Sequence, residues 1–381
     1  MRVDAQLFPQ GHAVGIAFCD RVIERKKLKV RFLNNEHTVL VAPRRYGKSS
    51  LIKQVLLDTK IPNTVIDLLP ATNAFFVYRA IKTSVVSLLN ELAPKTKPLR
   101  QKLLQFIQRF HPKLTLHLLG QQLEIATNQM PESSIIELLI SLDTAANNLG
   151  KKVVICLDEF QQVGLLKNYH SIEAAIRHAA ERSTRVTYVF SGSNRHLLSQ
   201  MFHSKSRPLY HLCDLLRLDR IESTIYADIL VSRVKKRWKS AVDKQVISEI
   251  LSLTKCHAYY VNALCRSLWK ETKKPTRLSV QKTWLDYIEM QKPWITDDLS
   301  RLSANQRNIL AAIAYSEVSE PYSQEFTEKV KISASSIKKS LGVLLRDDHV
   351  YQDQTGFYRV LDPALETYLH AICHFDFLEY D

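Results

Sequence analysis

A short basic loop near the start of the chain has the residue types that hold a polyphosphate. Residues 42–49 read Ala-Pro-Arg-Arg-Tyr-Gly-Lys-Ser. In the pattern G-x-x-x-x-G-K-[ST], backbone N–H groups surround the phosphates, the lysine reaches the β- and γ-phosphates, and the hydroxyl contacts magnesium. Gly47, Lys48 and Ser49 match this pattern, and Ala42 replaces its first glycine. The sequence predicts an ATP site at this loop; the alternative is a basic surface loop that matches by chance.

Two adjacent acids follow the apolar run Val153–Leu157, which reads as a buried strand. In a parallel sheet, ligands bind outside the carboxyl ends of the strands. Asp158 is therefore predicted to hold hydrated Mg²⁺, as in P-loop ATPases generally, and Glu159 to polarise the attacking water. The alternative is that both acids merely cap the next helix.

A further polar group and an arginine complete the candidate catalytic set. Ser191–Asn194 end the next apolar run, where Asn194 or Ser193 is a candidate to touch the attacking water or the γ-phosphate. The same four residues are also good turn sequence. Arg207 is a candidate arginine finger that reaches the γ-phosphate of a neighbouring subunit, or else a solvated charge.

The elements that must position these residues alternate between strands and helices. Apolar runs at 38–41, 63–68, 151–163 and 185–194 read as strands. Helical spacing of apolar residues begins at Ser49, runs throughout 73–149 and returns over about 170–182. Strands that are almost wholly apolar and alternate with helices predict an α/β fold with a parallel sheet covered on both faces.

The second half of the chain is predicted to be mostly helical. The β pattern stops at about residue 216, and four amphipathic stretches follow, around 224–239, 243–254, 258–271 and 278–290. From Leu302 the order is a helix, two helices joined by a turn, and a β-hairpin at 350–362, which is the order of a winged helix. The predicted domains are a P-loop ATPase core (1–215), a helical lid (216–300) and a winged-helix domain (301–381).

Composition excludes several classes of protein. The 381 residues are 45% hydrophobic and 24% charged, which excludes a disordered or fibrous chain, and nine glycines exclude collagen. No apolar run approaches the roughly 20 residues that span a bilayer, and no secretory signal is visible, so the chain is predicted to be cytoplasmic. Six scattered cysteines without a C-x-x-C predict neither a disulfide framework nor a zinc site.

The net charge of +15 favours a polyanionic partner, and its distribution predicts where that partner binds. Residues 1–215 hold 29 basic and 16 acidic residues, a net +13; residues 216–300 hold 16 and 10, a net +6; residues 301–381 hold 8 and 12, a net −4. Nucleic acid is therefore expected on the core and lid, at basic clusters in 25–31 and 235–239, which can also be ordinary solvated helix faces. The winged helix is expected to be a packing or protein-interaction module.

With these residues, the chain resembles the archaeal and bacterial P-loop ATPases related to origin-recognition initiators of the AAA+ class and to the STAND ATPases. Phe18–Arg21 is similar to the family's F-x-x-R segment beside the base, and the blocks at 158–161, 191–193 and 207–210 match as well. The resemblance implies that the following residues contact the nucleotide: Arg21, Pro43, Arg44, Arg45, Tyr46, Gly47, Lys48, Ser49 and Ser50. It also assigns Ser49 and Asp158 to the metal.

The resemblance extends through the lid to the C-terminal domain. The family's G-G-H-P-Y-Y element, which packs near the nucleotide and reports its state, corresponds to Lys255–Tyr260, where Cys256 replaces a glycine and Ala258 the proline. The family's winged helix ends in a D-P pair, matched by Asp362–Pro363.

The resemblance implies a nucleotide-driven module with ATP and Mg²⁺ as cofactors, and it does not supply a partner. The first hypothesis is an ATPase whose ATP binding and hydrolysis switch its conformation, with nucleic acid as the partner that the positive charge favours. One alternative is a regulatory protein that binds ATP tightly, hydrolyses it slowly and acts through a protein partner or self-association. Another is a transcription regulator whose winged helix reads DNA.

Overall fold

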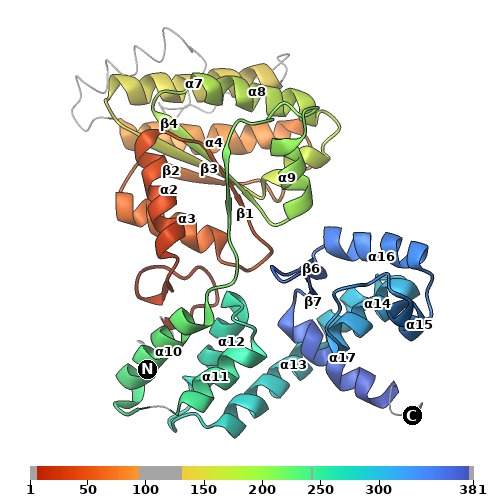
Figure 1. Ribbon diagram of the computed structural model, residues 1–381. Coiled ribbons are helices and arrows are strands. Elements are labelled where there is room, and N and C mark those ends of the chain that lie inside the picture. Colours follow the sequence, from red (N-terminus) through yellow and green to blue (C-terminus); the bar gives the residue numbers. More distant parts are fainter. Residues whose placement is uncertain (1–6, 94–130, 242, 377–381) are drawn as a thin grey trace. The chain divides into compact units, whose positions relative to one another are not determined.

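The computed structural model describes residues 7–93, 131–241 and 243–376 (Figure 1). The chain forms two compact units. The sheet unit contains Arg21–Arg44 and Lys48–Asp219. The helical unit contains the N-terminal segment through Asp20, the short stretch Arg45–Gly47, and everything from Arg220 onward. The middle of the predicted phosphate loop thus groups with the helical unit, while both of its flanks belong to the sheet unit.

The sheet unit is built on a five-stranded parallel sheet in the order β2-β3-β4-β1-β5. The strands are β1 (Thr38–Val41), β2 (Asn63–Asp67), β3 (Val153–Asp158), β4 (Val186–Gly192) and β5 (Asp214–Arg217). Strands β1, β3 and β4 are buried almost throughout, as expected for parallel strands covered on both faces. In this register Leu40 of β1 lies opposite Ser191 of β4, which aligns the carboxyl ends of the strands at one edge.

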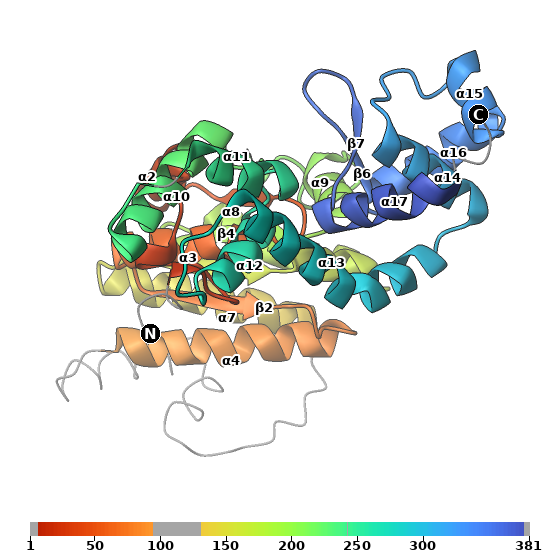
Figure 2. The ribbon, with the colours of Figure 1, turned by 90° about the horizontal axis from the view of Figure 1, so that it is seen from below.

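Helices cover both faces of this sheet (Figures 1 and 2). They are α2 (Val22–Asn34), α3 (Lys48–Thr59), α4 (Ala74–Leu92), α7 (Pro131–Asn148), α8 (Tyr169–Arg182), α9 (Arg195–His203) and the 3-10 turn η2 (Phe160–Leu165). One core joins α4, α7 and α8 to alternate strand residues such as Val39 and Val41. Leu40 lies between these two and points to the other face, where α2 packs against α3.

The helical unit contains two hydrophobic cores. The first joins α10 (Ser223–Trp238), α11 (Lys244–Leu253), α12 (Ala258–Leu268) and α13 (Arg277–Ser300), with Phe8 of the N-terminal segment packed on Trp269. The second joins α14 (Ala304–Tyr315), α15 (Gln324–Val330), α16 (Ala334–Arg346), the hairpin of β6 (Val350–Gln352) and β7 (Tyr358–Val360), and α17 (Pro363–Asp376). Helices α13 and α17 pack against each other and join the two cores.

The predicted α/β sheet, the four lid helices and the helix–helix–turn–helix–hairpin order are confirmed. The elements that the sequence did not predict include the helix α9, the strand β5 and the helix α17. The β pattern continues to Arg217 because Asp214–Arg217 forms the edge strand β5, whose charged ends hide it in the sequence. Helix α17 follows the hairpin and closes the second core. The middle of the helical stretch predicted over 73–149 lies outside the described residues, and the domain bounds near 215 and 300 stay predictions.

In the described part of the chain, no helix is long and apolar enough to cross a membrane. No cluster of three or more histidine, cysteine or acidic side chains suited to a metal occurs among the same residues.

Candidate nucleotide site

The loop at 42–49 has the backbone shape of an anion-binding turn. Arg45 (φ 64°) and Gly47 (φ 91°) are left-handed, whereas the other loop residues, Ala42 included, keep negative φ. Such alternation turns successive N–H groups toward one concave side, and Gly47 adopts it readily because it has no Cβ. Helix α3 begins at Lys48, so its N-terminus adds the positive end of a helix dipole at the same place.

Lys48 is buried and its ammonium group lies against the loop. The side-chain Nζ donates to the carbonyl oxygens of Ala42 (3.0 Å) and Pro43 (3.2 Å), and the residue is only 6% exposed. A buried ammonium group is costly unless it is hydrogen-bonded or paired with an anion. The loop therefore holds a fixed positive charge beside its own N–H groups, where phosphate oxygens would complete the pairing.

Asp158, at the carboxyl end of β3, is held by two hydroxyl groups. Its Oδ2 accepts a hydrogen bond from Ser49 Oγ (3.0 Å), and its Oδ1 accepts one from Ser191 Oγ (2.6 Å). The hydroxyl of Ser49 and the carboxylate of Asp158 are hard oxygen ligands of the kind that Mg²⁺ takes, together with waters and substrate phosphates. The predicted metal pair is thus in contact, and the donors present fit the ion.

Glu159 reaches the end of the neighbouring strand β4. Its backbone is left-handed (φ 51°), an uncommon conformation for a residue with a Cβ. Its Oε2 accepts hydrogen bonds from Ser193 Oγ (2.8 Å), Ser193 N (3.3 Å) and Gln161 Nε2 (2.5 Å). Glu159 is the N-cap residue of η2, but its side chain makes no capping bond there and instead joins the ends of β3 and β4.

Ser191 and Gln161 are the site residues that sequence reasoning did not assign. Ser191 is fully buried and positions Asp158, and a polar residue inside an otherwise apolar strand was the available signal. Gln161 is 4% exposed and packs so closely on Gly192 that a Cβ at Gly192 would lie 1.9 Å from Gln161 Oε1. A residue with a Cβ at position 192 would displace the end of the Gln161 side chain, which favours the glycine of the S-G-S block.

Comparison with solved structures places this arrangement in a known fold. The structure matches a Walker-type ATPase of Pyrococcus abyssi over 96% of this chain and 99% of that chain, with a TM-score of 0.69 and 18% identity. It also matches the ORC2 protein of Aeropyrum pernix in its ADPNP–ADP complexes (97% and 96% covered, TM-score 0.59, 14% identity). The chain has the fold of a Walker-type ATPase.

The structure also matches a protein that was solved in complex with DNA. The ORC1 protein of Aeropyrum pernix in complex with DNA matches over 97% of this chain and 96% of that chain, with a TM-score of 0.50 and 13% identity. A family model described as "Probable winged helix domain" matches residues 296–371. A search of curated proteins found no match. At these identities the likeness to the Walker-type ATPases is one of fold.

The side chain of Asn194, one of the predicted catalytic residues, lies in a helix cap. Asn194 Oδ1 accepts from the Leu197 backbone N–H (2.9 Å) and so caps α9. In the described chain, no hydrogen bond joins Asn194 to Asp158 or Glu159. It is Ser193, the other candidate, that contacts Glu159, and the contact of either residue with water or γ-phosphate stays a prediction.

Arg207 is engaged within its own chain. Its Nε donates to Glu173 Oε2 (3.2 Å), its Nη2 pairs with Glu173 Oε1, and its guanidinium group stacks 4.1 Å from the ring centre of Tyr169. Burial raises the pKa of the Glu173 carboxyl to about 7, against the opposing effect of Arg207. Arg207 is not a solvated charge, and the arginine-finger role stays a prediction that requires this pair to open.

The remaining predicted contacts flank the loop. Arg21 is left-handed (φ 64°) and 7% exposed, and it pairs with Glu24 (3.0 Å). Pro43 is buried, Arg44 is exposed, and Ser50 lies half-buried in the first turn of α3. Their contacts with a nucleotide stay predictions.

The lid element at Lys255–Tyr260, beside Arg45 and Tyr46, begins with two residues in an uncommon backbone conformation. Lys255 (φ 49°) and Cys256 (φ 55°) are both left-handed, which is the conformation that glycine adopts most readily. Burial, with the nearby charges of Arg220 and Arg45, lowers the pKa of His257 to about 3, so the ring is neutral at pH 7. Its Nδ1 caps α12 by accepting from the Tyr259 N–H (3.3 Å).

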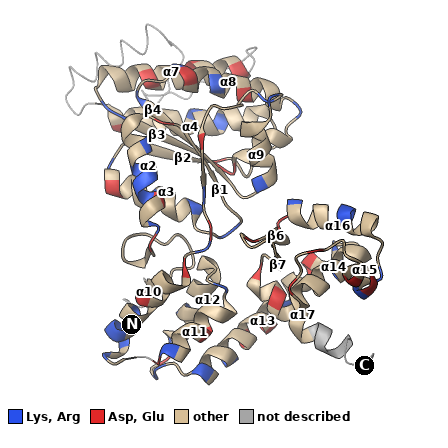
Figure 3. Cartoon of the chain, in the orientation of Figure 1, with Lys and Arg blue, Asp and Glu red and all other residues tan. Residues whose placement is uncertain are grey.

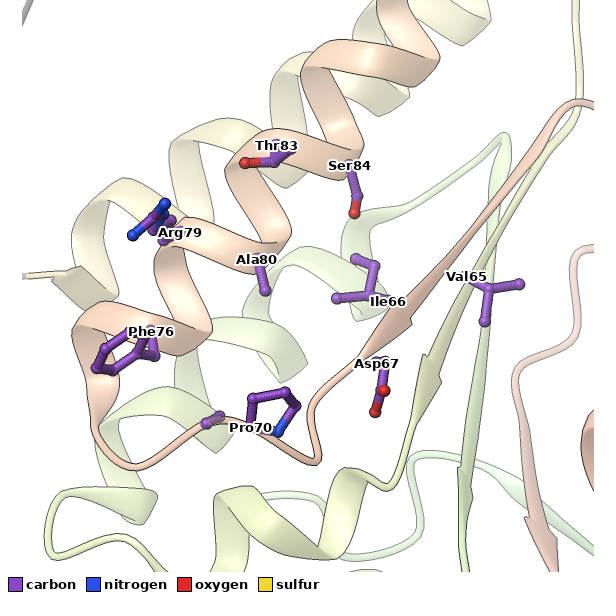
Figure 4. Close-up of a pocket in the computed structure, with 10 residues that line it drawn as sticks. Val65, Ile66, Asp67, Pro70, Phe76, Arg79, Ala80, Thr83 and Ser84 are labelled. Carbon is purple, nitrogen blue, oxygen red and sulfur yellow. The ribbon is translucent and has the colours of Figure 1, made fainter.

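One pocket lies elsewhere in the sheet unit, between the edge strand β2 and helix α4 (Figure 4). Its volume is about 350 Å³, and Ala80 and Ser84 of α4 lie opposite Ile66 of β2 in it. None of its lining residues belongs to the loop or the acid pair, so it contributes nothing to the nucleotide site.

Proposed function

We propose that the chain binds Mg²⁺-ATP at the loop 42–49 and hydrolyses it, with the bound and hydrolysed states acting as a conformational switch. The observation that carries this proposal is the linked pair of acids. Asp158 shares a hydrogen bond with the loop hydroxyl of Ser49, and Glu159 is held by Ser193 at the next strand end. One carboxylate thus faces the metal position and the other is fixed beside it.

Each residue has a defined task in this proposal. When bound, Mg²⁺ neutralises charge on the β- and γ-phosphates. Lys48 donates to the terminal phosphates, while Ser49 and Asp158 hold the ion. Glu159 orients the attacking water and accepts its proton, because Ser193 and Gln161 keep its carboxylate in one orientation. The ORC2 protein, similar in fold, was solved with ADPNP and ADP, which supports an adenine nucleotide here.

The test is steady-state ATP hydrolysis by Glu159→Gln. Removal of a positioned general base is expected to lower turnover by about 10²–10⁴-fold while ATP stays bound, because Lys48, Ser49 and Asp158 are untouched. Glu181→Gln, on the exposed end of α8, is the matched control and should hydrolyse ATP like the wild type. Unchanged turnover in Glu159→Gln would contradict the proposed chemistry.

We infer that nucleic acid is a partner, and that it contacts a basic surface of the lid, here named the lid patch. The patch joins the last turn of α10 to the loop before α13, because Trp238 Nε1 donates to the Thr272 carbonyl (3.1 Å). Figure 3 shows Lys and Arg gathered at these helix ends. Its exposed members are Lys235, Lys236, Lys239, Lys270, Lys273 and Lys274. Such charge supplies contacts to phosphates with little sequence preference.

A second candidate function is a slowly hydrolysing, ATP-bound switch that acts through a protein partner. The observation that favours it is the bonding between lid and winged helix: Tyr260 Oη donates to Asp362 Oδ2 (2.5 Å) and Trp284 Nε1 to Thr367 Oγ1 (3.1 Å). Because of these bonds, a movement of the lid would also move the winged helix, which could pass the change on to a protein partner. A single-turnover rate slower than nucleotide release, with tight ATP binding, would favour this candidate.

A further inference from the structure

Arg220 ties three separate segments of the helical unit together. Its Nε donates to Tyr46 Oη (3.1 Å), its Nη1 to the Lys255 carbonyl (3.0 Å) and its Nη2 to the Leu361 carbonyl (2.8 Å). Tyr46 is the tip of the phosphate loop, Lys255 belongs to the turn before α12, and Leu361 follows the hairpin of the winged helix. A planar guanidinium group with five N–H donors can serve three acceptors at once; a lysine ammonium group cannot reproduce that fork.

The loop side of this junction is packed as well as hydrogen-bonded. The ring of Tyr46 is buried and lies edge-on to His257, with the ring centres 4.8 Å apart. The neighbouring Arg45 stacks its guanidinium group 4.1 Å from the ring centre of Tyr259. Because Tyr46 directly precedes Gly47 and Lys48, a change in its position moves the N–H groups and the lysine that are to hold the phosphates.

The winged-helix side of the junction is anchored to the lid over one short segment. Asp362, next to Leu361, accepts from Tyr260 Oη (2.5 Å) and also caps α17 through the Ala364 N–H (2.8 Å). One turn later, Glu366 pairs with Lys255 (3.7 Å). Displacing the winged helix would therefore pull on the carbonyl that Arg220 holds and on the turn that carries Lys255.

We propose that Arg220 is a positioning residue that couples the phosphate loop to the winged helix, so that nucleotide affinity depends on whether the winged helix is seated on the lid. The inference rests on the proposed function, since it concerns regulation of the same nucleotide site. The coupling is reciprocal by thermodynamic necessity: a partner that displaces the winged helix lowers nucleotide affinity by the same factor as nucleotide loss weakens the seating.

The test measures dissociation of a fluorescent ATP analogue with Mg²⁺ from the full chain by stopped flow. Tyr46→Phe removes only the hydroxyl acceptor and keeps the ring on His257. Arg220→Lys keeps the charge and loses the fork. Each variant should release nucleotide about tenfold faster, the size expected for one hydrogen bond to a charged group. Arg277→Lys, which alters a lid ion pair with Glu249, is the matched control and should release nucleotide at the wild-type rate.

Double variants measure the coupling itself. If the residues had only separate structural roles, their effects on the release rate would multiply. Tyr46→Phe combined with Arg220→Lys should release nucleotide no faster than Arg220→Lys alone, because that variant already loses the bond to Tyr46. Tyr260→Phe, which loosens the winged-helix anchor, should also speed release and be non-additive with Tyr46→Phe. Effects that multiply, or single variants with wild-type rates, overturn the coupling. A wild-type chain that binds no ATP analogue overturns the proposed function instead.

Discussion

Two acidic sites in the sheet unit differ in how their charge is matched. Glu173 is fully buried and meets Arg207, which pairs with both of its carboxylate oxygens. Asp158 and Glu159 are held only by neutral hydroxyl, amide and backbone N–H donors among the described residues. Within the described residues, the first site is bonded to a cation, whereas the donors that orient the second are neutral. Oriented but unmatched negative charge is what a metal-dependent site requires, and the contrast separates a structural ion pair from a candidate active site.

The largest expected effect follows from removing the positive charge of the loop. Lys48→Ala should abolish measurable binding of an ATP analogue with Mg²⁺, because Lys48 supplies the buried ammonium group beside the phosphate position. Equilibrium fluorescence titration measures it, with the melting temperature as a check on folding. Lys53→Ala, on the same helix α3, should bind normally. Wild-type affinity in Lys48→Ala would remove the loop from the nucleotide site.

The next prediction tests the unmatched carboxylate at the metal position. Asp158→Asn should raise the Mg²⁺ concentration needed for ATP hydrolysis by at least about tenfold, the lower end of the effect of disturbing a ligand shell. Asp67→Asn is a matched control, because Asp67 ends the neighbouring strand β2 directly opposite Asp158 in register. A magnesium titration of both variants gives the comparison. Equal, small shifts in the two would mean that Asp158 is structural.

Breaking the Arg207–Glu173 pair should lower the stability of the fold rather than the rate of ATP hydrolysis. Arg207→Met leaves Glu173 buried without its cation, which should cost about 3–5 kcal/mol of unfolding free energy. The pKa of Glu173 is already raised to about 7, and loss of Arg207 raises it further. A raised carboxyl pKa contributes stability at low pH that is lost as pH rises through it. The melting-temperature deficit of Arg207→Met should therefore be larger at pH 8 than at pH 5.

The same variant decides between the two roles of Arg207. With the fold intact at pH 6, where Glu173 is largely protonated, Arg207→Met should hydrolyse ATP close to the wild-type rate. A folded variant that binds ATP but has lost hydrolysis would support the arginine finger and contradict the structural pairing. Arg207→Lys, which keeps the charge but loses the two-point contact, should be intermediate in stability.

The sequence was sufficient for features carried by local patterns. The loop 42–49, the strand β3 and its two acids are each contiguous, and parallel-sheet geometry alone implies that they share one edge. The partners that orient them come from elsewhere in the chain: Ser191 on β4 holds Asp158, and Gln161 fits against Gly192. No sequence spacing predicts that Ser191 bonds to Asp158 or that Gln161 packs on Gly192. Arg220 was missed for the same reason, since two of its three acceptors are backbone carbonyls, which any residue type supplies.

The hydrophobic pattern of the sequence also did not predict the edge strand β5. Strand β5 has only four residues, two of them charged, so its pairing with β1 decides its conformation more than its composition does. Arg207 lies in a recognisable sequence pattern, the block 207–210 that is similar to the family, but this pattern does not reveal its partner. Its role depends on Glu173, which is 34 residues away and brought close by the packing of α8.

The smallest expected effect concerns two groups of exposed basic residues, the lid patch and those of the winged helix. Positive charge is exposed on both the lid patch and the winged helix, but the lid segment 216–300 has a net +6 and residues 301–381 a net −4. On α2, by contrast, Arg25 already pairs with Asp58 (2.7 Å). Phosphate contacts weaken with salt by a slope of roughly 0.9 per contact in log–log form. Charges surrounded by acids contribute less to that slope, so the lid patch should dominate.

The last prediction compares two full-length charge variants in binding to double-stranded DNA at several salt concentrations. Neutralising Lys235, Lys236 and Lys239 with glutamine should reduce the salt slope by up to about 3 and weaken binding uniformly across sequences. Neutralising Lys338 and Lys339, exposed on α16, should change the slope by less than about 1. Substitution is preferable to deletion of the winged helix, because Trp284 and Tyr260 of the lid bond to its α17 segment. If the α16 variant loses the larger share, or loses sequence preference, then the winged helix is the DNA-reading element despite its net negative charge.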